Sequence, residues 1–228
     1  MNSKRTFYCE LAYIIGIVIL AFSTALMEKA DFGLSMVVAP AYLIHLKVAE
    51  TFPFYTFGMS EYIFQAVLLV LLTGVMRKFK ISYLFSFVTA ILYGLLLDVM
   101  MVVVGMFPLG GIVWRFVFFV VGLLTCSLSI ALLFHTYVPP EAYEMFVKEF
   151  SGKYRLPIAK VKTVYDLTSC AVSIVLSFAF YGFGVFVGIK WGTIVCALIN
   201  GWIIGKFSDW LDKKYAFKDA FPLRNKLS

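Results

Sequence analysis

The chain has 228 residues, of which 62% are hydrophobic and 14% are charged, and its formal net charge is +7. Soluble domains contain about 45–50% apolar and about 25% charged residues, and a chain of this length cannot enclose a core large enough for such an apolar surplus. The composition therefore excludes a soluble globular domain and predicts an all-α integral membrane protein whose main partner is the lipid bilayer.

Six apolar segments are long enough to cross a bilayer as helices, because about 20 residues span its hydrocarbon core. In chain order they are residues 8–28, 58–76, 82–105, 111–135, 161–182 and 185–205. If the N-terminus is cytoplasmic, all but four of the 20 Lys and Arg residues face the cytoplasm, the exceptions being Lys29, Lys47, Arg115 and Lys190. The positive-inside rule then predicts that both termini are cytoplasmic, with a basic tail at 206–228.

The positive charge alternates with apolar segments, whereas a nucleic-acid-binding protein gathers Lys and Arg on one face of a folded domain. We therefore expect no nucleic-acid partner. The cysteines Cys9, Cys126, Cys170 and Cys196 have no metal-ligand spacing, so neither a metal site nor another cofactor is expected.

Two connections between the crossings are too long to be tight turns. They cover residues 29–57, on the outer side, and residues 136–160, on the cytoplasmic side. Each contains a stretch, at 36–50 and 139–150, that is too short to span the membrane. The sequence leaves open whether these stretches are interfacial or re-entrant.

The two halves of the chain share a sequence pattern. Ala41-Tyr42 with Lys47 matches Ala142-Tyr143 with Lys148, and Glu61 then matches Asp166 in the same order. We interpret this as a three-helix unit used twice within a single transmembrane domain of residues 1–228, as repeat A at about 8–105 and repeat B at about 111–205. Because each unit has an odd number of spans, the second copy is inverted, as in many secondary transporters. The alternative is that small and aromatic residues recur by chance.

Three carboxylates lie within predicted spans, where an ionisable group is costly unless it is paired or in contact with water. They are Glu61, Asp98 and Asp166, and we expect them to bind a substrate or a coupling ion. The neutral residues Gln65 and Asn200 and the cation Arg115 complete the candidate binding residues.

Each of these residues also has a purely structural explanation. Asp98 would pair with Arg115, and Glu61 would begin a helix at the interface, where the helix dipole favours an acid. Asp166 would pair with Lys160 or Lys162 at the cytoplasmic surface. Interhelical hydrogen bonding would account for Gln65 and Asn200. 

No catalytic residue is predicted. The sequence contains no HExxH, GxSxG or P-loop motif, so we do not expect an enzyme.

The segments Ala30-Asp31-Phe32-Gly33-Leu34-Ser35, Gly94-Leu95-Leu96-Leu97-Asp98 and Gly188-Ile189-Lys190-Trp191-Gly192-Thr193 carry a family resemblance. Over roughly residues 8–205 the chain resembles the YczE/YyaS/YitT family of bacterial integral membrane proteins, and is closest to its YczE-like branch. The resemblance implies a multi-pass protein of the bacterial cytoplasmic membrane. It implies no particular activity.

Three functions are compatible with these observations. The favoured one is a secondary transporter or exporter of an unknown small solute, working by alternating access between the two repeats. The alternatives are a substrate-binding membrane subunit of a multi-component importer and a membrane scaffold or accessory protein without transport. Six short spans form a small bundle, which is compatible with a homodimer.

Overall fold

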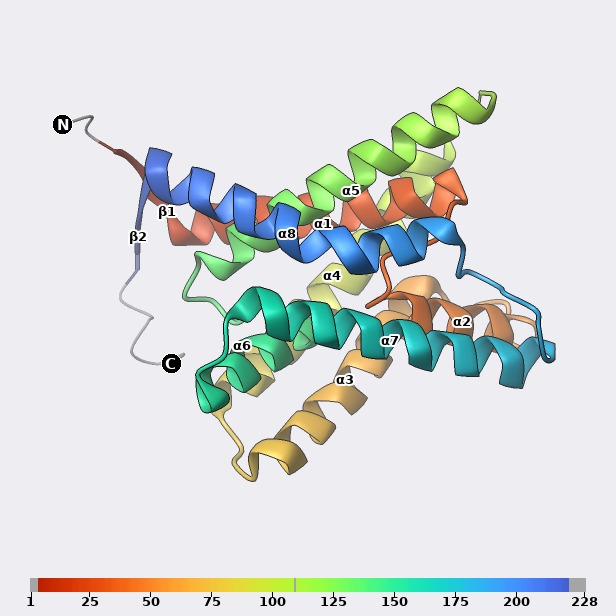
Figure 1. Ribbon diagram of the computed structural model, residues 1–228, viewed down its shortest axis with the longest axis horizontal. Helices are drawn as coiled ribbons and strands as arrows, with labels where there is room; N and C mark the ends of the chain where they lie inside the picture. The colour runs from red at the N-terminus through yellow and green to blue at the C-terminus, as the bar shows by residue number, and fades with distance from the viewer. Residues whose placement is uncertain (1–3, 109, 222–228) are drawn as a thin grey trace.

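The computed structural model describes residues 4–108 and 110–221. In these residues the chain forms eight helices and one two-stranded sheet (Figure 1). In chain order the elements are β1 (Arg5–Tyr8), α1 (Cys9–Ala30), α2 (Ala39–Ala49), α3 (Phe57–Met76), α4 (Ile81–Gly105), α5 (Ile112–Phe134), α6 (Ala142–Tyr154), α7 (Ile158–Tyr181), α8 (Trp191–Lys214) and β2 (Tyr215–Lys218). All the helices except the short α2 and α6 are long and apolar enough to span a membrane, which confirms the all-helical membrane class predicted from composition.

The last predicted span is wrong at both ends. The segment from 185 to 190 is not helical, and α8 begins at Trp191 and continues through Lys214, into the predicted basic tail. The cause lies in the backbone: Gly182, Gly184 and Gly188 all have positive φ angles, which a right-handed helix does not contain. A hydropathy pattern cannot detect these backbone angles, so it predicts that the segment from 185 to 190 is part of the last apolar span.

The most extensive contact between helices is that of α1 with α5; α4 packs on α1 and α8 packs on α5. In Figure 1, α1, α5 and α8 lie along one side of the molecule, and α2, α3, α6 and α7 lie along the other. The contacts of the first four helices have counterparts among the last four. The contact of α1 with α4 corresponds to that of α5 with α8, and the contact of α3 with α4 corresponds to that of α7 with α8. Likewise α2 packs on α3 and α7, as α6 packs on α7 and α3.

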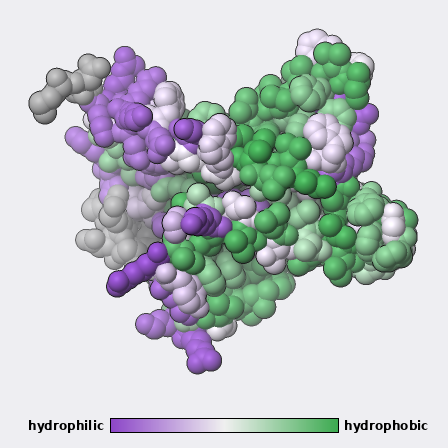
Figure 2. Space-filling model, in the orientation of Figure 1, coloured by the Kyte–Doolittle hydropathy of each residue, from purple (hydrophilic) through white to green (hydrophobic). Residues whose placement is uncertain are grey.

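Both described ends of the chain lie at the same end of the bundle, where β1 and β2 pair in parallel (Figure 1). We call this the terminal end and the opposite one the distal end. Figure 2 shows most polar residues gathered toward the terminal end of this face and mainly apolar residues over the rest of it, apart from a smaller polar group near the distal end. Large apolar side chains such as Val70, Val113 and Trp202 are 67–72% exposed, as expected for a surface that faces lipid.

The two short helices begin inside the bundle and run to opposite ends. At the start of α6, the Ala142 backbone N–H donates to Gln65 near the middle of α3, and at its other end Lys153 reaches the Val75 carbonyl at the terminal end of α3. At the far end of α2, Lys47 lies over the ring of Tyr181, the last residue of α7. Each short helix therefore begins within the bundle and ends at its edge.

Candidate functional site: a polar cluster between the short helices

A group of polar side chains is buried where α3, α6 and α7 meet. We call it the central polar cluster. Its members are each no more than 2% exposed, and they are Glu61, Gln65, Glu141, Tyr143, Glu144, Lys162 and Asp166. Buried ionisable groups are costly inside a membrane protein, so this cluster is the candidate functional site.

Gln65 links two carboxyl groups of the cluster. Its Nε2 donates to Glu61 Oε2 and to Glu141 Oε2, both at 3.3 Å, and its Oε1 accepts from the Ala142 backbone N–H at 3.0 Å. The Tyr143 hydroxyl also donates to Glu61 Oε2, at 2.9 Å. One amide side chain therefore fixes the beginning of α6 against the middle of α3.

Lys162 is the cation of the cluster. Its Nζ lies 2.9 Å from Asp166 Oδ1, one helical turn along α7, and 3.6 Å from Glu144 Oε1 on α6. Burial raises the pKa of Glu144, and Lys162 offsets part of that rise. Burial also raises the pKa of Glu141, and the neighbouring carboxyl groups of Glu144 and Glu61 raise it further. These two groups therefore hold protons at a higher pH than exposed glutamates do.

A closed pocket adjoins the cluster at the beginning of both short helices. It has a volume of about 10 Å³, enough for one water molecule, and its polar lining consists of Thr24, Ser35, Tyr93, Cys126, Glu141, Tyr143 and Glu144. Val38, the residue before α2, lines the same pocket. We call it the central pocket.

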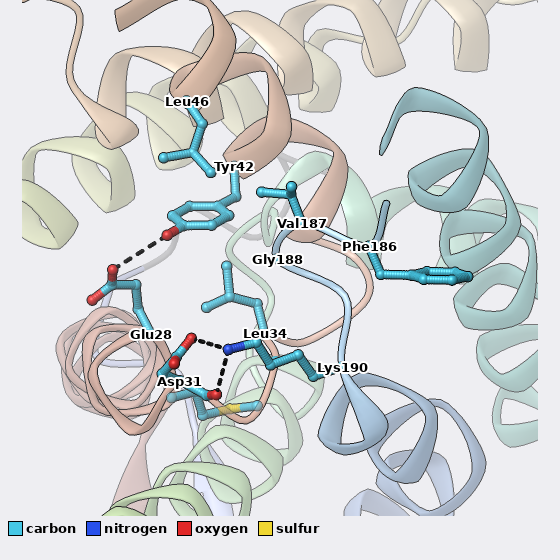
Figure 3. Close-up of a pocket in the computed structure, with 11 residues that line it drawn as sticks. Glu28, Asp31, Leu34, Tyr42, Leu46, Phe186, Val187, Gly188 and Lys190 are labelled. Carbon is cyan, nitrogen blue, oxygen red and sulfur yellow. Dashed lines mark hydrogen bonds and ion pairs between the residues drawn. The ribbon is translucent and has the colours of Figure 1, made fainter. Parts of the chain in front are cut away.

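A larger cavity lies between the central pocket and the distal end of the bundle. This vestibule has a volume of about 280 Å³ and lies between the end of α1, α2 and the connection before α8. Figure 3 shows the Tyr42 hydroxyl pointing toward Glu28 and the Lys190 ammonium toward Asp31. Leu34 lines the vestibule and the next residue, Ser35, lines the central pocket. Only a short stretch of chain therefore separates the two cavities.

An ion-pair network borders the vestibule. Asp31 pairs with Lys190 on the chain before α8 and, at 2.7 Å, with Arg115 on α5. Burial acts to raise the pKa of Asp31, but the two cations outweigh it and hold that pKa below its usual value. The turn that follows Asp31 depends on Gly33, whose φ is +106° and where a Cβ would lie 3.0 Å from the Lys190 backbone nitrogen.

The structure places three of the six sequence candidates, Glu61, Gln65 and Asp166, in the central polar cluster. The interfacial position expected for Glu61 is wrong, since its side chain is 0% exposed. Asp166 has the expected partner, Lys162, but the pair is buried within the bundle and does not lie at the surface.

The other three candidates lie elsewhere. Asp98 accepts hydrogen bonds from Thr56 and Gly58 at the start of α3, while Arg115 pairs with Asp31. The expected pair of Asp98 with Arg115 is therefore wrong, because Asp98 faces α3 and Arg115 faces the end of α1. Asn200 accepts from Ser127 at 2.6 Å and joins α8 to α5.

Sequence reasoning missed Glu141, Tyr143 and Glu144, and treated Lys162 only as a surface partner. The available signal was two glutamates three residues apart directly after Pro139-Pro140, in a connection too short to span the membrane.

The six apolar helices and their lipid-compatible surface define a multi-pass membrane protein. The chain matches the model of DUF6198, a family of unknown function, over residues 7–209 and belongs to that family. No match was found among curated proteins or among solved structures. The family match does not test the resemblance to the YczE-like branch, which stays a prediction.

Proposed function

We propose that the protein is a secondary transporter of a small solute across the bacterial cytoplasmic membrane, with its terminal end in the cytoplasm. The observation that carries the proposal is the pair of short helices, α2 and α6, which begin at one buried polar pocket and run to opposite ends of the bundle. Transporters built from inverted repeats use interrupted helices of this kind to form a substrate site near the middle of the membrane.

Two further features support alternating access. The matched helix contacts of the two halves agree with two inverted units, α1–α4 and α5–α8, that move against each other. The vestibule gives the central pocket an approach from the distal end. In this conformation the central polar cluster and α6 fill the path toward the terminal end.

The proposal is tested by labelling a cysteine placed in the central pocket, in a background where the four native cysteines are replaced. Ser35→Cys should react with a membrane-impermeant thiol reagent added from either face, because the pocket opens to each in turn. The matched control is Ser129→Cys on α5, whose side chain is fully buried and bonds only its own helix. It should react from neither face. A scaffold predicts that Ser35→Cys also stays unreactive from both faces, and labelling from one face only would contradict alternating access.

A ligand screen tests the binding site separately. A solute that binds the native state raises the melting temperature of the purified protein by mass action. The stabilisation should be lost in Glu61→Gln and in Asp166→Asn but retained in Asp98→Asn, because Asp98 lies outside the central polar cluster.

A further inference from the structure

The unsatisfied atoms of the central pocket are almost all hydrogen-bond acceptors. Glu141 Oε1 and Glu144 Oε2 are buried and make no hydrogen bond, although other atoms of the same side chains are bonded or ion-paired. Ser35 Oγ, which lines the same pocket, is likewise buried without a hydrogen bond. A ligand that satisfies this pocket must bring donors.

The first backbone donor of each short helix is already used. In α6, the Ala142 N–H donates to Gln65. In α2, the Ala39 N–H donates to the Ser35 carbonyl, and the next residue, Pro40, has no N–H. Helix N-termini usually attract anions through free N–H groups, and at this pocket neither Ala142 nor Ala39 offers one.

The charge balance favours a cationic ligand. Four carboxyl groups of the central polar cluster, those of Glu61, Glu141, Glu144 and Asp166, are buried beside a single ammonium group. Within residues 4–108 and 110–221, Lys162 pairs with Glu144 and Asp166, and neither Glu61 nor Glu141 has an ion-pair partner. All four carboxyl groups therefore cannot be ionised at once without a further positive charge.

The groups that interact with Glu141 come from most of the surrounding helices. They are Tyr13 of α1, Glu61 and Gln65 of α3, Tyr93 of α4, Tyr143 and Glu144 of α6, and Lys162 of α7. Lys162 is the one cation in this set, and it is shared by two other carboxylates. The charge that Glu141 lacks must come from a bound proton or a bound cation.

We propose that the central pocket binds a small organic ammonium ion in exchange for a proton held by Glu141. On binding, the O–H bond of the carboxyl group breaks and the proton leaves to solvent. The ammonium group then donates its N–H bonds to the carboxylate and to Ser35 Oγ. The pocket must widen to admit the carbon skeleton, because its closed volume of about 10 Å³ holds one water molecule.

Proton release on binding tests this exchange directly. The full-length protein in weakly buffered detergent micelles near neutral pH is mixed with ammonium, methylammonium, butylammonium or putrescine chloride, and a pH-sensitive dye reports protons. We expect at least one of these salts to acidify the solution saturably. Glu141→Gln keeps an acceptor for Gln65 but has no proton to exchange, so it should lose most of the release.

The matched control is Glu149→Gln, on α6, the helix that Glu141 immediately precedes. Glu149 pairs with Lys80 away from the central pocket, so this variant should release protons like the parent. The inference is overturned if none of the four salts releases protons, if Glu141→Gln releases as many as the parent, or if sodium acetate produces a saturable pH change that the ammonium salts do not.

The direction and coupling of this exchange rest on the proposed transport function, whereas binding does not. Saturable proton release without flux of the same cation into proteoliposomes would support the cation site and contradict transport. Flux of a neutral or anionic solute without proton release would support transport and contradict the cation site.

Discussion

The Asp98 carboxylate on α4 accepts a hydrogen bond of 2.8 Å from the backbone N–H of Gly58 on α3. Its second oxygen accepts from the Thr56 hydroxyl at 2.7 Å, and Thr56 itself accepts from the Met59 N–H. One acid therefore satisfies the beginning of a neighbouring helix, where backbone N–H groups have no partner within their own helix. This arrangement also explains the close packing of α3 on α4, since a Cβ at Gly58 would lie 2.6 Å from Asp98 Oδ2.

Asp98→Ala should lower the free energy of unfolding by about 1–2 kcal/mol, the usual cost of losing a helix cap. Asp98→Asn keeps an acceptor and should lose less. Unfolding of the purified protein in detergent by a chemical denaturant measures both. The exposed Asp209 provides the control Asp209→Asn, which should leave stability unchanged. Equal stability of Asp98→Ala and the parent would contradict the capping role.

Arg115 should be energetically coupled to Asp31 and not to Asp98. In double-mutant cycles, Arg115→Met with Asp98→Asn should be additive within about 0.5 kcal/mol, because the two residues share no partner. Arg115→Met with Asp31→Asn should be non-additive, since their side chains are 2.7 Å apart. Coupling of Arg115 to Asp98, together with additivity of Arg115 and Asp31, would show that Asp98 and not Asp31 is the partner of Arg115.

The contribution of Asp31 should depend on pH. Its pKa in the folded protein lies below the ordinary value of 3.8, so its ion pairs stabilise the fold fully above that value. The stabilisation is lost as the pH falls through the lowered pKa. The difference in melting temperature between the parent and Asp31→Asn should therefore be constant near neutral pH and vanish in acid. High salt should reduce it, because the Asp31 side chain is 60% exposed. A difference in melting temperature that grows in acid would contradict a lowered pKa for Asp31.

Replacing Lys162 should be strongly destabilising. Lys162→Met leaves Glu144 and Asp166 buried without their cation, and removing one member of a buried ion pair costs about 3–5 kcal/mol. Adding Asp166→Asn to Lys162→Met should recover part of that loss, because one uncompensated carboxylate is then removed. Denaturant unfolding measures both variants, with the exposed Lys206→Met as the control. A single variant as stable as the parent would show that Lys162 is not needed to balance the cluster.

Hydropathy was sufficient to predict the first five spanning helices, because their apolar lengths match the bilayer. It failed at the start of α8, where the backbone conformation of three glycines decides the structure and the side-chain pattern does not. The pairing of β1 with β2 joins residues more than 200 positions apart, and neither four-residue segment signals a partner in its own sequence.

The candidate site was predictable where an ionisable residue interrupts a spanning helix, as Glu61 and Asp166 do. Glu141 and Glu144 were missed because they lie in a connection. The depth of a connection depends on how its chain folds back into the bundle, and composition does not report that depth. The partners of Asp98 and Arg115 were also unpredictable, because which neighbouring helix a side chain faces depends on packing.

The parallel pairing of β1 with β2 separates membrane insertion from completion of the fold. Residues 5–8 pair with residues 215–218, and Glu10 at the start of α1 accepts hydrogen bonds from the backbone N–H groups of Ala220 and Phe221. Because β1 precedes β2 in the chain, residues 5–8 obtain these partners only after all the intervening helices have been made. A chain ending before residue 215 would still contain all six apolar helices, yet its first helix would lack the strand that ties it to the last.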